Sequence, residues 1–338
     1  MGIRWQRGNR SLQTQLAATL ADPSRHAGSI ELLVDRPGRR RLLRLTTDAG
    51  DVLFVKQTCS RALSAFRAGA AATGLDAAAR EWRALSKLHR AGVAVPEPIA
   101  LGTLANGDRV LATRFLEGST LKDRLEQSDR CTRSQRSAML SAVGKLVHRF
   151  HAAGYIHRDL HWGNILITKS GPVLLDLQSA LPTTIAFARR RDLGDLDYSV
   201  APRLPISDRT RLRAAALGIE GPFGPAERRA LRSIGEASLA SGRAHAASRT
   251  RRTLRPGRQY APIRLGLDRG FRRREVSERE VAIALAARDA AVGDAGCQIL
   301  KSDARAQVTA VSASSLSWIV KDYRAGGWLR RVADLFRG

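Results

Sequence analysis

Short apolar runs separated by turn residues open the chain. Three such runs lie at residues 29–34, 41–46 and 51–57. The segments between them, Asp35–Gly38 and Thr47–Gly50, carry the Asp, Pro and Gly residues that are typical of tight turns. This pattern predicts a small antiparallel sheet. Residues 1–28 before it are expected to form a polar leader with a short helix around Ser11–Leu20.

The apolar positions then change to a helical period. Residues 70–90 place Trp82, Leu85 and Leu88 on one face, and residues 132–153 repeat apolar side chains at the same spacing. Between these predicted helices lie two expected strands, at the end of residues 92–102 and at 109–116, and then a hinge and helix at 117–125. Residues 203–275 are Arg-rich and helical in part, around Ala226–Leu239. A sheet followed by helices favours an α+β fold.

One polar stretch, Tyr155-Ile-His-Arg-Asp-Leu-His-Trp-Gly-Asn-Ile-Leu-Ile167, has the residues for a reaction. Asp159 is followed five residues later by Asn164, and a β-like run then leads to Asp176. Phosphoryl transfer needs this arrangement, because one carboxylate orients the attacking hydroxyl while an amide and a second carboxylate hold Mg²⁺ against the phosphates of ATP. A lone His-Arg-Asp triplet would indicate only a turn. The complete pattern favours a kinase-like site.

Other parts of the chain supply candidate nucleotide-binding groups. Lys56 ends the third predicted strand, where a lysine that pairs with phosphate belongs. Glu81 is the candidate carboxylate partner, since its predicted helix offers no basic residue three or four positions away. The adenine ring would be received by backbone groups of Arg114, Phe115 and Leu116.

The phosphate cradle departs from the usual kinase pattern. The turn between the first two predicted strands contains only Gly38, so the Gly-rich loop is absent. We expect either a short cradle or phosphate contacts from Arg36, Arg39 and Arg40. The second metal motif reads Asp176-Leu-Gln178 instead of Asp-Phe-Gly, which makes a mobile activation loop less expected.

Two histidines and an arginine run accompany the predicted catalytic residues. His157 is expected to pack and hydrogen-bond beneath the metal-binding Asp, and His161 to pack within the loop, because it has no second ligand beside it. The run Arg189–Arg191 is either a solvated face or a clamp for an acceptor phosphate. Asp192, in an Asp-Leu-x-x-Leu segment, is expected to begin a helix and to interact with its dipole.

Taken together, these motifs resemble those of bacterial lipopolysaccharide kinases, which phosphorylate heptose or 3-deoxy-octulosonate (Kdo) of the lipid A core. The resemblance covers about residues 30–200. It implies a bilobal protein-kinase-like fold, with an antiparallel sheet in the N-lobe and a mainly helical C-lobe, and an ATP- and Mg²⁺-dependent transfer to a sugar hydroxyl at the cytoplasmic face of the membrane. By the match, the ATP, metal and catalytic roles fall to Lys56, Glu81, Asp159, Asn164 and Asp176.

Two other functions stay open at this point. A kinase with another acceptor, either a protein Ser/Thr kinase or a small-molecule phosphotransferase, would share the same core. The missing Gly-rich loop and activation segment disfavour a peptide acceptor. A nucleotide-binding pseudokinase scaffold on a membrane is disfavoured by the intact set of Lys56, Asp159, Asn164 and Asp176.

Composition narrows the setting of the protein. The chain has 338 residues and a net charge of +26, and because only seven residues are Lys, nearly all of the excess is Arg. This charge indicates either a polyanionic partner, such as a lipid A–core glycolipid or an anionic membrane surface, or GC-rich codon usage. No nucleic-acid motif is evident, so no such partner is expected. The three scattered thiols, Cys59, Cys131 and Cys297, favour a reducing compartment. Without an apolar run long enough to span a bilayer, the expected location is cytoplasmic, with peripheral membrane contact open.

The predicted division of the chain is a leader, an N-lobe, a C-lobe with an Arg-rich tail, and an extension, at residues 1–28, 29–117, 118–275 and 276–338. Within the C-lobe tail, residues 257–274 are expected to form a linker or a returning hairpin. In the extension, Ile319-Val-Lys321 matches Phe54-Val-Lys56. Our hypothesis is that residues from 276 onward begin a second copy of the N-lobe, with chance similarity as the alternative. The basic amphipathic stretch Trp328–Arg337 favours either core packing or an anionic lipid surface.

Overall fold

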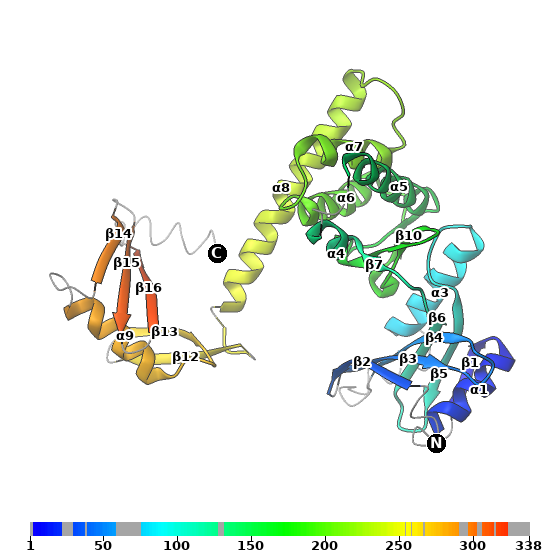
Figure 1. Cartoon of the computed structure of the whole chain (residues 1–338), viewed down its shortest axis with the longest axis horizontal. Helices are drawn as coiled ribbons and strands as arrows, with labels where there is room; N and C mark the ends of the chain where they lie inside the picture. The colour runs from blue at the N-terminus through cyan, green and yellow to red at the C-terminus, as the bar shows by residue number, and fades with distance from the viewer. Residues whose placement is uncertain are drawn as a thin grey trace. The chain divides into compact units, whose positions relative to one another are not determined.

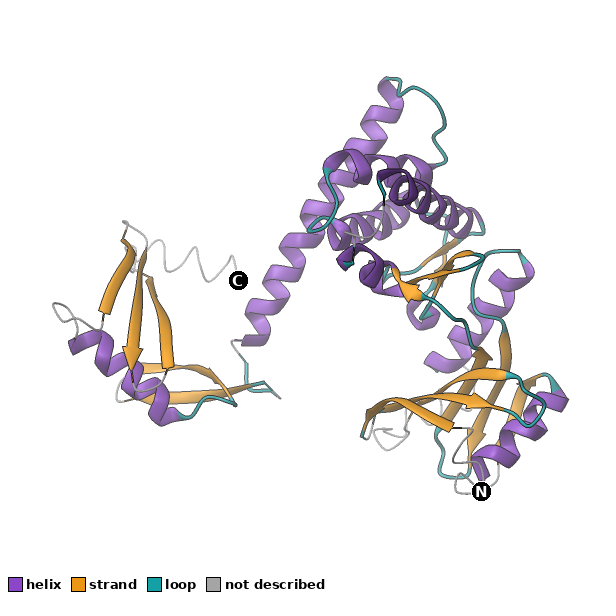
Figure 2. Ribbon diagram, in the orientation of Figure 1, coloured by secondary structure: helices purple, strands orange, loops and turns teal. Residues whose placement is uncertain are grey.

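The structure is a computed structural model. It describes residues 3–21, 30–37, 39–58, 76–127, 132–253, 255–257, 259–265, 268–290, 297–302, 306–313 and 316–323. The chain divides into two compact units, Met1–Ser241 and Gly242–Gly338. The first unit contains two lobes, one made mainly of strands and one mainly of helices, as the strand and helix colours of Figure 2 show.

The N-lobe is built on a six-stranded antiparallel sheet with the strand order β1-β5-β6-β4-β3-β2 (Figure 1). Its strands are β1 (Ile3–Gly8), β2 (Ile30–Arg36), β3 (Arg40–Thr46), β4 (Val52–Thr58), β5 (Pro98–Leu104) and β6 (Arg109–Arg114). The three apolar runs near the N-terminus are β2, β3 and β4, and they pair as neighbouring antiparallel strands. The predicted sheet is therefore confirmed.

Helices α1 (Arg10–Ala21) and α3 (Ala77–Arg90) pack on opposite faces of this sheet. Leu16 of α1 belongs to one core cluster with Val110 and Ala112 of β6, whereas Leu88 of α3 belongs to another cluster with Leu111 of β6. Successive residues of a strand point to opposite faces, so these alternate residues reach different helices. The same alternation in β4 decides which of its side chains face α3.

The start of the chain differs from the predicted leader. Residues 3–8 form β1, which pairs antiparallel with β5, and α1 packs against the sheet through Leu12 and Leu16. Ile3 and Trp5 alternate with Arg4 and Gln6 along β1, and this short period-2 pattern places one half of the strand against the core. The first 21 residues thus belong to the N-lobe to the extent that they are described.

The C-lobe is mainly helical, with small sheets where the predicted site lies. Its helices are α4 (Leu121–Glu126), α5 (Arg133–Ala152), α6 (Ala186–Val200), α7 (Ile206–Leu217) and α8 (Pro225–Thr253). Its strands are β7 (Ser119–Thr120), β8 (Tyr155–Ile156), β9 (Ile165–Thr168), β10 (Gly171–Leu174) and β11 (Leu181–Pro182). Thr132 caps α5 in a capping box with Gln135, and Leu146 and Phe150 of α5 are fully buried. The predicted helix at 132–153 is therefore confirmed.

One helix begins at a different residue from the prediction. Asp192 does not begin α6, because the helix begins at Ala186, six residues earlier. The segment from Ala186 to Arg191 is made largely of good helix formers, and Asp192 lies inside the helix with a buried carboxylate. The expectation that this carboxylate interacts with the N-terminal end of the helix is wrong.

The second unit begins within α8 and continues with a hairpin, a helix and a sheet. These elements are β12 (Tyr260–Leu265), β13 (Asp268–Arg273), α9 (Glu278–Ala290), β14 (Cys297–Ser302), β15 (Ala306–Ala313) and β16 (Leu316–Tyr323). Strands β12 and β13 pair antiparallel, so a returning hairpin lies where a linker was the alternative. The last three strands form an antiparallel sheet in the order β14-β15-β16.

The pairing of β14–β16 repeats the pairing of β2–β4. In the first unit a β-bulge leaves Leu33 unpaired, and the next position of the ladder leads across β3 to Lys56. In the second unit a β-bulge leaves Leu300 unpaired, and the next position leads across β15 to Lys321. In both units a strand and a helix precede the three strands. The second copy of the N-lobe stays a prediction, and so do the divisions at residues 117 and 275.

Some predictions fall outside the described residues, among them those on Gly38, Cys59, Cys131 and the amphipathic stretch 328–337. In the part of the chain that the structure describes, no helix is long and apolar enough to cross a membrane. The predicted α+β, bilobal, protein-kinase-like fold is confirmed.

Candidate active site

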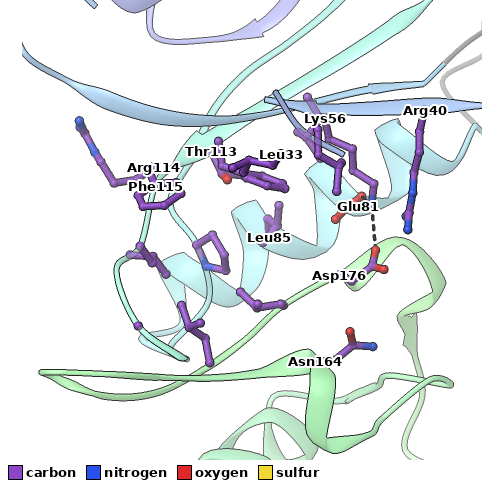
Figure 3. Close-up of a pocket in the computed structure, with 18 residues that line it drawn as sticks. Leu33, Arg40, Lys56, Glu81, Leu85, Thr113, Arg114, Phe115, Asn164 and Asp176 are labelled. Carbon is purple, nitrogen blue, oxygen red and sulfur yellow. Dashed lines mark hydrogen bonds and ion pairs between the residues drawn. The ribbon is translucent and has the colours of Figure 1, made fainter. Parts of the chain in front are cut away.

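Lys56 contacts two carboxylates, Glu81 in its own lobe and Asp176 in the C-lobe. Its Nζ atom lies 2.9 Å from Oε2 of Glu81 and 2.8 Å from Oδ1 of Asp176 (Figure 3). Leu53 and Val55 of β4 are buried against the α1 side of the sheet, so Phe54 and Lys56 point to the other side, where α3 lies. Strand periodicity therefore directs the lysine toward α3. The structure places Lys56 against Glu81, its predicted partner, and also against Asp176, which was predicted as a metal ligand.

Glu81 is placed by the burial pattern of α3. Asp76 caps the helix by accepting a hydrogen bond from the Ala79 amide at 2.9 Å. Glu81, Leu85 and Leu88 lie on one buried face, since residues four and seven positions apart fall on the same side of a helix. The carboxylate thus stands on an apolar helix face with Lys56 as its hydrogen-bond partner.

Burial and ion pairing shift the pKa values of Lys56 and Glu81 in opposite directions. Burial would lower the pKa of Lys56, but the charges of Glu81 and Asp176 outweigh it and raise the pKa above the ordinary value. Burial raises the pKa of the Glu81 carboxyl, while Lys56 lowers it and Asp176 raises it further. The lysine is therefore held as a cation, which is the form that neutralises phosphate charge.

Two residues of the candidate site have left-handed backbone conformations, which residues other than glycine rarely adopt. Arg158 has φ 65° and Asp176 has φ 54°. Such conformations cost about 1–3 kcal/mol each and persist where surrounding contacts hold them. His157 supplies one such contact, because its Nε2 atom donates to the carbonyl of Leu175 at 2.9 Å, directly before Asp176. The predicted position of His157, hydrogen-bonded beneath Asp176, is what the structure shows.

Asp192 supplies the other contact. Its carboxylate accepts hydrogen bonds from the backbone amides of His157 at 2.6 Å and Arg158 at 2.8 Å. His151 of α5 lies 3.2 Å from the same carboxylate, which is buried. Helix α6 therefore fixes the loop that carries Asp159. Sequence reasoning missed this role. The signal was an Asp preceded by good helix formers, which argued against a helix start at that residue.

Asp159 and Asn164 stand at the two ends of this loop. The Asp159 side chain is 61% exposed, and the Nε2 atom of His161 lies 4.0 Å from its Oδ1 atom. The Asn164 side-chain amide donates to the Asp159 carbonyl at 2.9 Å, and the Asn164 carbonyl accepts from the Leu175 amide at 2.9 Å. The Asp159 carboxylate is therefore open to solvent and accessible to an incoming hydroxyl.

His161 has a local role, as predicted. Its Nδ1 atom accepts a hydrogen bond from the Gly163 amide at 3.0 Å, at the start of the short 3-10 helix Trp162–Asn164. The Trp162 amide donates to the Ser199 hydroxyl of α6 at 3.1 Å. These bonds tie the loop between Asp159 and Asn164 to itself and to α6.

A cavity of about 380 Å³ lies between the lobes of the first unit. Its polar residues include Lys56, Glu81, Asn164 and Asp176 (Figure 3). Its apolar wall is formed by Leu33, Leu42, Phe54, Leu85, Pro96, Leu111, Phe115, Leu116, Leu166 and Leu175. An apolar slot that ends in a charged cluster suits a planar base joined to phosphates.

The hinge segment, Arg114 to Leu116, has one backbone amide that is available to a ligand, that of Leu116. Arg114 and Phe115 donate their amides to the carbonyls of Glu97 and Val52, at 2.9 and 3.0 Å. The Leu116 amide has no hydrogen-bond partner among the described residues, and Leu116 lines the cavity. The Arg114 guanidinium forms ion pairs with Asp51 and Glu97, so its side chain stabilises the hinge.

The phosphate end of the cavity is shaped by the β2–β3 hairpin. The bulge turns Leu33 into the cavity, and Arg40 lines it as well, whereas Arg36 and Arg39 are not among its lining residues. The charge of Arg40 also lowers the pKa of Glu81. Of the three arginines expected to replace a glycine cradle, the structure therefore brings only Arg40 to the site. Leu33 was missed, because a bulge has no distinct sequence pattern here.

Asn164 and Asp176 fit a magnesium site. Oδ1 of Asp176 accepts a hydrogen bond from Lys56, and Oδ2 has no hydrogen-bond partner among the described residues. The side-chain nitrogen of Asn164 donates to the Asp159 carbonyl, and the side-chain oxygen has no partner among the described residues. Two oxygen donors suit Mg²⁺, which keeps few protein ligands and takes the rest from phosphates and water. No group of three His, Cys, Asp or Glu side chains that could hold a metal occurs in the described residues. Phosphate oxygens are therefore needed to complete such a site.

A family model described as the lipopolysaccharide kinase (Kdo/WaaP) family matches residues 43–215. The chain belongs to this family. The matched range includes Lys56, Glu81, Asp159, Asn164 and Asp176. A search of curated proteins gives no match.

Membership in the lipopolysaccharide kinase family confirms the resemblance predicted for about residues 30–200. It identifies the chain as a phosphotransferase, a kinase that acts on lipopolysaccharide. The cluster around Lys56 is accordingly the candidate active site of a lipopolysaccharide kinase.

Proposed function

We propose that the chain transfers the γ-phosphoryl group of ATP, with Mg²⁺, to a sugar hydroxyl of the lipopolysaccharide core, on heptose or Kdo. The observation that carries this proposal is the contact of Lys56 with both Glu81 and Asp176 in the cavity that Asn164 also lines. This arrangement puts a cation and two oxygen donors at the same end of an apolar slot. The reaction would take place at the cytoplasmic face of the membrane.

Each residue has a role in this reaction. The Leu116 amide donates to the adenine, and Lys56, held by Glu81, pairs with phosphate oxygens. Asn164 and Asp176 hold Mg²⁺, which when bound neutralises charge on the phosphates. Asp159 orients the sugar hydroxyl and accepts its proton. As the hydroxyl oxygen bonds to the γ-phosphorus, the bond from that phosphorus to the β–γ bridging oxygen breaks and ADP leaves.

Little covalent chemistry is required of the protein. Phosphoryl transfer is accelerated mainly by positioning and by neutralising charge in the transition state. The hydrogen bonds of Asp192 and His157 support this view, because they fix the two backbone segments that carry Asp159 and Asp176.

The test is transfer of labelled phosphate from ATP to purified lipid A–core oligosaccharide, comparing the wild type with Asp159→Ala. We expect label on the glycolipid and a loss of about 10³-fold or more in the variant. Glu126→Ala, which removes an exposed carboxylate from α4, is the matched control and should keep full activity.

The alternative acceptors and functions are separate outcomes of the same assay. Label on protein, or on a small hydroxyl compound but not on the glycolipid, would replace the lipopolysaccharide acceptor. No transfer to any acceptor, with ATP still bound, would indicate a scaffold. An Asp159→Ala variant as active as the wild type would refute the assigned role of Asp159.

A further inference from the structure

The segment that connects Asp176 to helix α6 has exposed residues in its middle. It runs from Asp176 to Asp192, and both ends are fixed at the catalytic centre: Asp176 contacts Lys56, and Asp192 holds the amides of the catalytic loop. Between them β11 pairs with β8, the strand directly before His157. The residues between these anchors therefore lie at the rim of the site where the acceptor must arrive.

This rim has large apolar side chains in solvent. Ile185 is 64% exposed and Phe187 is 69% exposed, and Leu181 of β11 is exposed as well. Leu181 lies in β11, which pairs with β8, and Ile185 and Phe187 follow within six residues at the start of α6, so three large apolar side chains are exposed along this short segment. Scattered single exposed apolar residues need no explanation, but a group of them beside a catalytic loop does.

The same rim has unneutralised positive charge. Arg189, Arg190 and Arg191 make no side-chain hydrogen bond or ion pair with any described residue, and Arg190 and Arg191 are exposed. On α6, positions three and four residues after Phe187 share its face, so Arg190 and Arg191 lie on the same side of the helix as the exposed ring. By contrast, the arginines of the neighbouring helix α7 at positions 209 and 213 are paired with Asp197.

We propose that this rim, Leu181 to Arg191, is the surface through which the kinase binds the anionic lipid layer that contains its acceptor. Ile185 and Phe187 would enter the apolar region, and Arg190 and Arg191 would pair with lipid phosphates. Apolar side chains on one face with arginines beside them are the composition of an interfacial membrane contact. A nucleic acid would use the arginines but would leave the aliphatic side chain of Ile185 without a partner.

This membrane-binding surface rests on the proposed function, the transfer to a lipid-linked acceptor, and it identifies the residues that bind the lipid. Both the apolar and the charged residues are needed, because a single weak anchor gives only marginal membrane binding. Binding is therefore expected to depend on anionic lipid and to weaken as salt concentration rises. Lipid binding at this rim would bring the acceptor hydroxyl next to Asp159, since β11 of the rim pairs with β8 and β8 leads directly into the catalytic loop.

The test is co-flotation of the full chain with vesicles of phosphatidylcholine alone and of an equal mixture of phosphatidylcholine and phosphatidylglycerol. The wild type should bind the anionic vesicles only. The double variant Ile185→Ser/Phe187→Ser should bind them at least about tenfold more weakly. Arg190→Gln/Arg191→Gln should lose about fivefold in affinity for each guanidinium removed.

Helix α8 offers a matched control. Leu239 is 68% exposed, and Arg228 and Arg229 are also exposed on this helix. The triple variant Leu239→Ser/Arg228→Gln/Arg229→Gln removes the same kinds of side chain from outside the segment Leu181–Arg191 and should bind within about twofold of the wild type. Binding of an ATP analogue to each variant checks that the active site is folded.

The outcomes separate this surface from the proposed reaction. A wild type that does not float with anionic vesicles, or rim variants that bind like the wild type, would overturn the proposal even if the protein phosphorylates a soluble core sugar. Binding of an RNA duplex through the same arginines without vesicle binding would overturn it too. A protein that floats through the rim but transfers no phosphate to any sugar would refute the proposed reaction and leave the surface standing.

Discussion

At the scale of single residues, the chemistry depends on one lysine between two carboxylates. Lys56 is within hydrogen-bond distance of Glu81 and Asp176, which come from an N-lobe helix and a C-lobe loop. A buried charge is tolerated when its partners compensate for lost hydration, and here two partners share that task. The cluster is therefore both a contact between the lobes and the phosphate end of the cavity.

Glu81→Gln should lower kcat/KM for ATP by about 100-fold. The amide cannot hold Lys56 by charge, so the lysine would turn to Asp176 alone and leave its phosphate-binding position. Because burial of the Glu81 carboxylate is itself costly, the free energy of unfolding should change by no more than about 1.5 kcal/mol. Steady-state kinetics and urea unfolding measure both, with Glu126→Gln as the control. An unchanged kcat/KM would show that Glu81 does not position the lysine.

Asp176→Asn should raise the Mg²⁺ concentration that gives half-maximal transfer. The change keeps the shape of the side chain but removes the charge that favours a divalent cation. We expect a loss of about 10²-fold or more in kcat, and complete loss in the wild type when EDTA removes the metal. Titration of Mg²⁺ at saturating ATP measures the shift. If the variant needs no more Mg²⁺ than the wild type, Asp176 is not a metal ligand.

At the scale of elements, strands and helices place side chains that are far apart in sequence. Alternation along β4 separates the core residues Leu53 and Val55 from Lys56. Helix α6 contributes a buried carboxylate that receives two backbone amides of the catalytic loop. The loop owes its conformation to a helix that begins almost thirty residues later in the chain.

Asp192→Asn should impair catalysis although Asp192 is placed outside the cavity. An amide has one acceptor oxygen instead of two, so one loop amide, at His157 or Arg158, would lose its partner. We expect kcat to fall by at least about tenfold, with KM for ATP little changed, and stability to fall by about 1–3 kcal/mol. The separate effects on kcat and KM distinguish a positioning residue from one that only supports folding. Equal loss of both, scaling with the unfolded fraction, would contradict this role.

At the scale of the whole molecule, the kinase unit is held together by buried ion pairs as well as by its core. Asp197 of α6 accepts two hydrogen bonds from Arg213 of α7, each 2.7 Å, and also pairs with Arg209. Burial would raise the pKa of this carboxyl, but the hydrogen bonds from Arg213, Arg209 and Ser238 outweigh it and hold the pKa below its ordinary value of 3.8.

This lowered pKa predicts an acid-sensitive kinase unit. The pairing stabilises the fold fully above the ordinary pKa of 3.8 and is lost as pH falls through the lower folded-state value. Asp197→Asn should cost about 3–5 kcal/mol at neutral pH, since two arginines lose a charged partner. The difference from wild type should shrink below pH 3.8 in urea unfolding followed across pH. A difference that stays constant with pH would contradict the pKa direction.

The two units offer a natural comparison between lysines. Lys56 and Lys321 occupy the same place in their strand ladders, but the catalytic stretch from Tyr155 to Asp176 occurs once in the sequence. Lys56→Ala should therefore reduce transfer by at least about 100-fold, and Lys321→Ala should leave it within about twofold. Parallel assays of the two variants decide this. Loss of transfer in Lys321→Ala would mean that the second unit contributes to the site.

The sequence by itself determined the local patterns. Turn residues between apolar runs predicted β2–β4, and helical spacing predicted α5. The spacing of Asp159, Asn164 and Asp176 predicted a kinase-like site, and the motifs around it carried the resemblance to the family. These features could be found because each depends on residues close in the chain, where backbone sterics and side-chain periodicity act directly.

Only the tertiary structure decided what distant segments do to one another. It made a strand of residues 3–8, because β5 provides the partner for β1. It turned Asp192 from a predicted helix start into the acceptor for the catalytic loop, and it brought Arg40 but neither Arg36 nor Arg39 to the cavity. The physical reason is common to these cases: pairing partners, bulges and burial are contacts between residues far apart in sequence, and no local pattern specifies them.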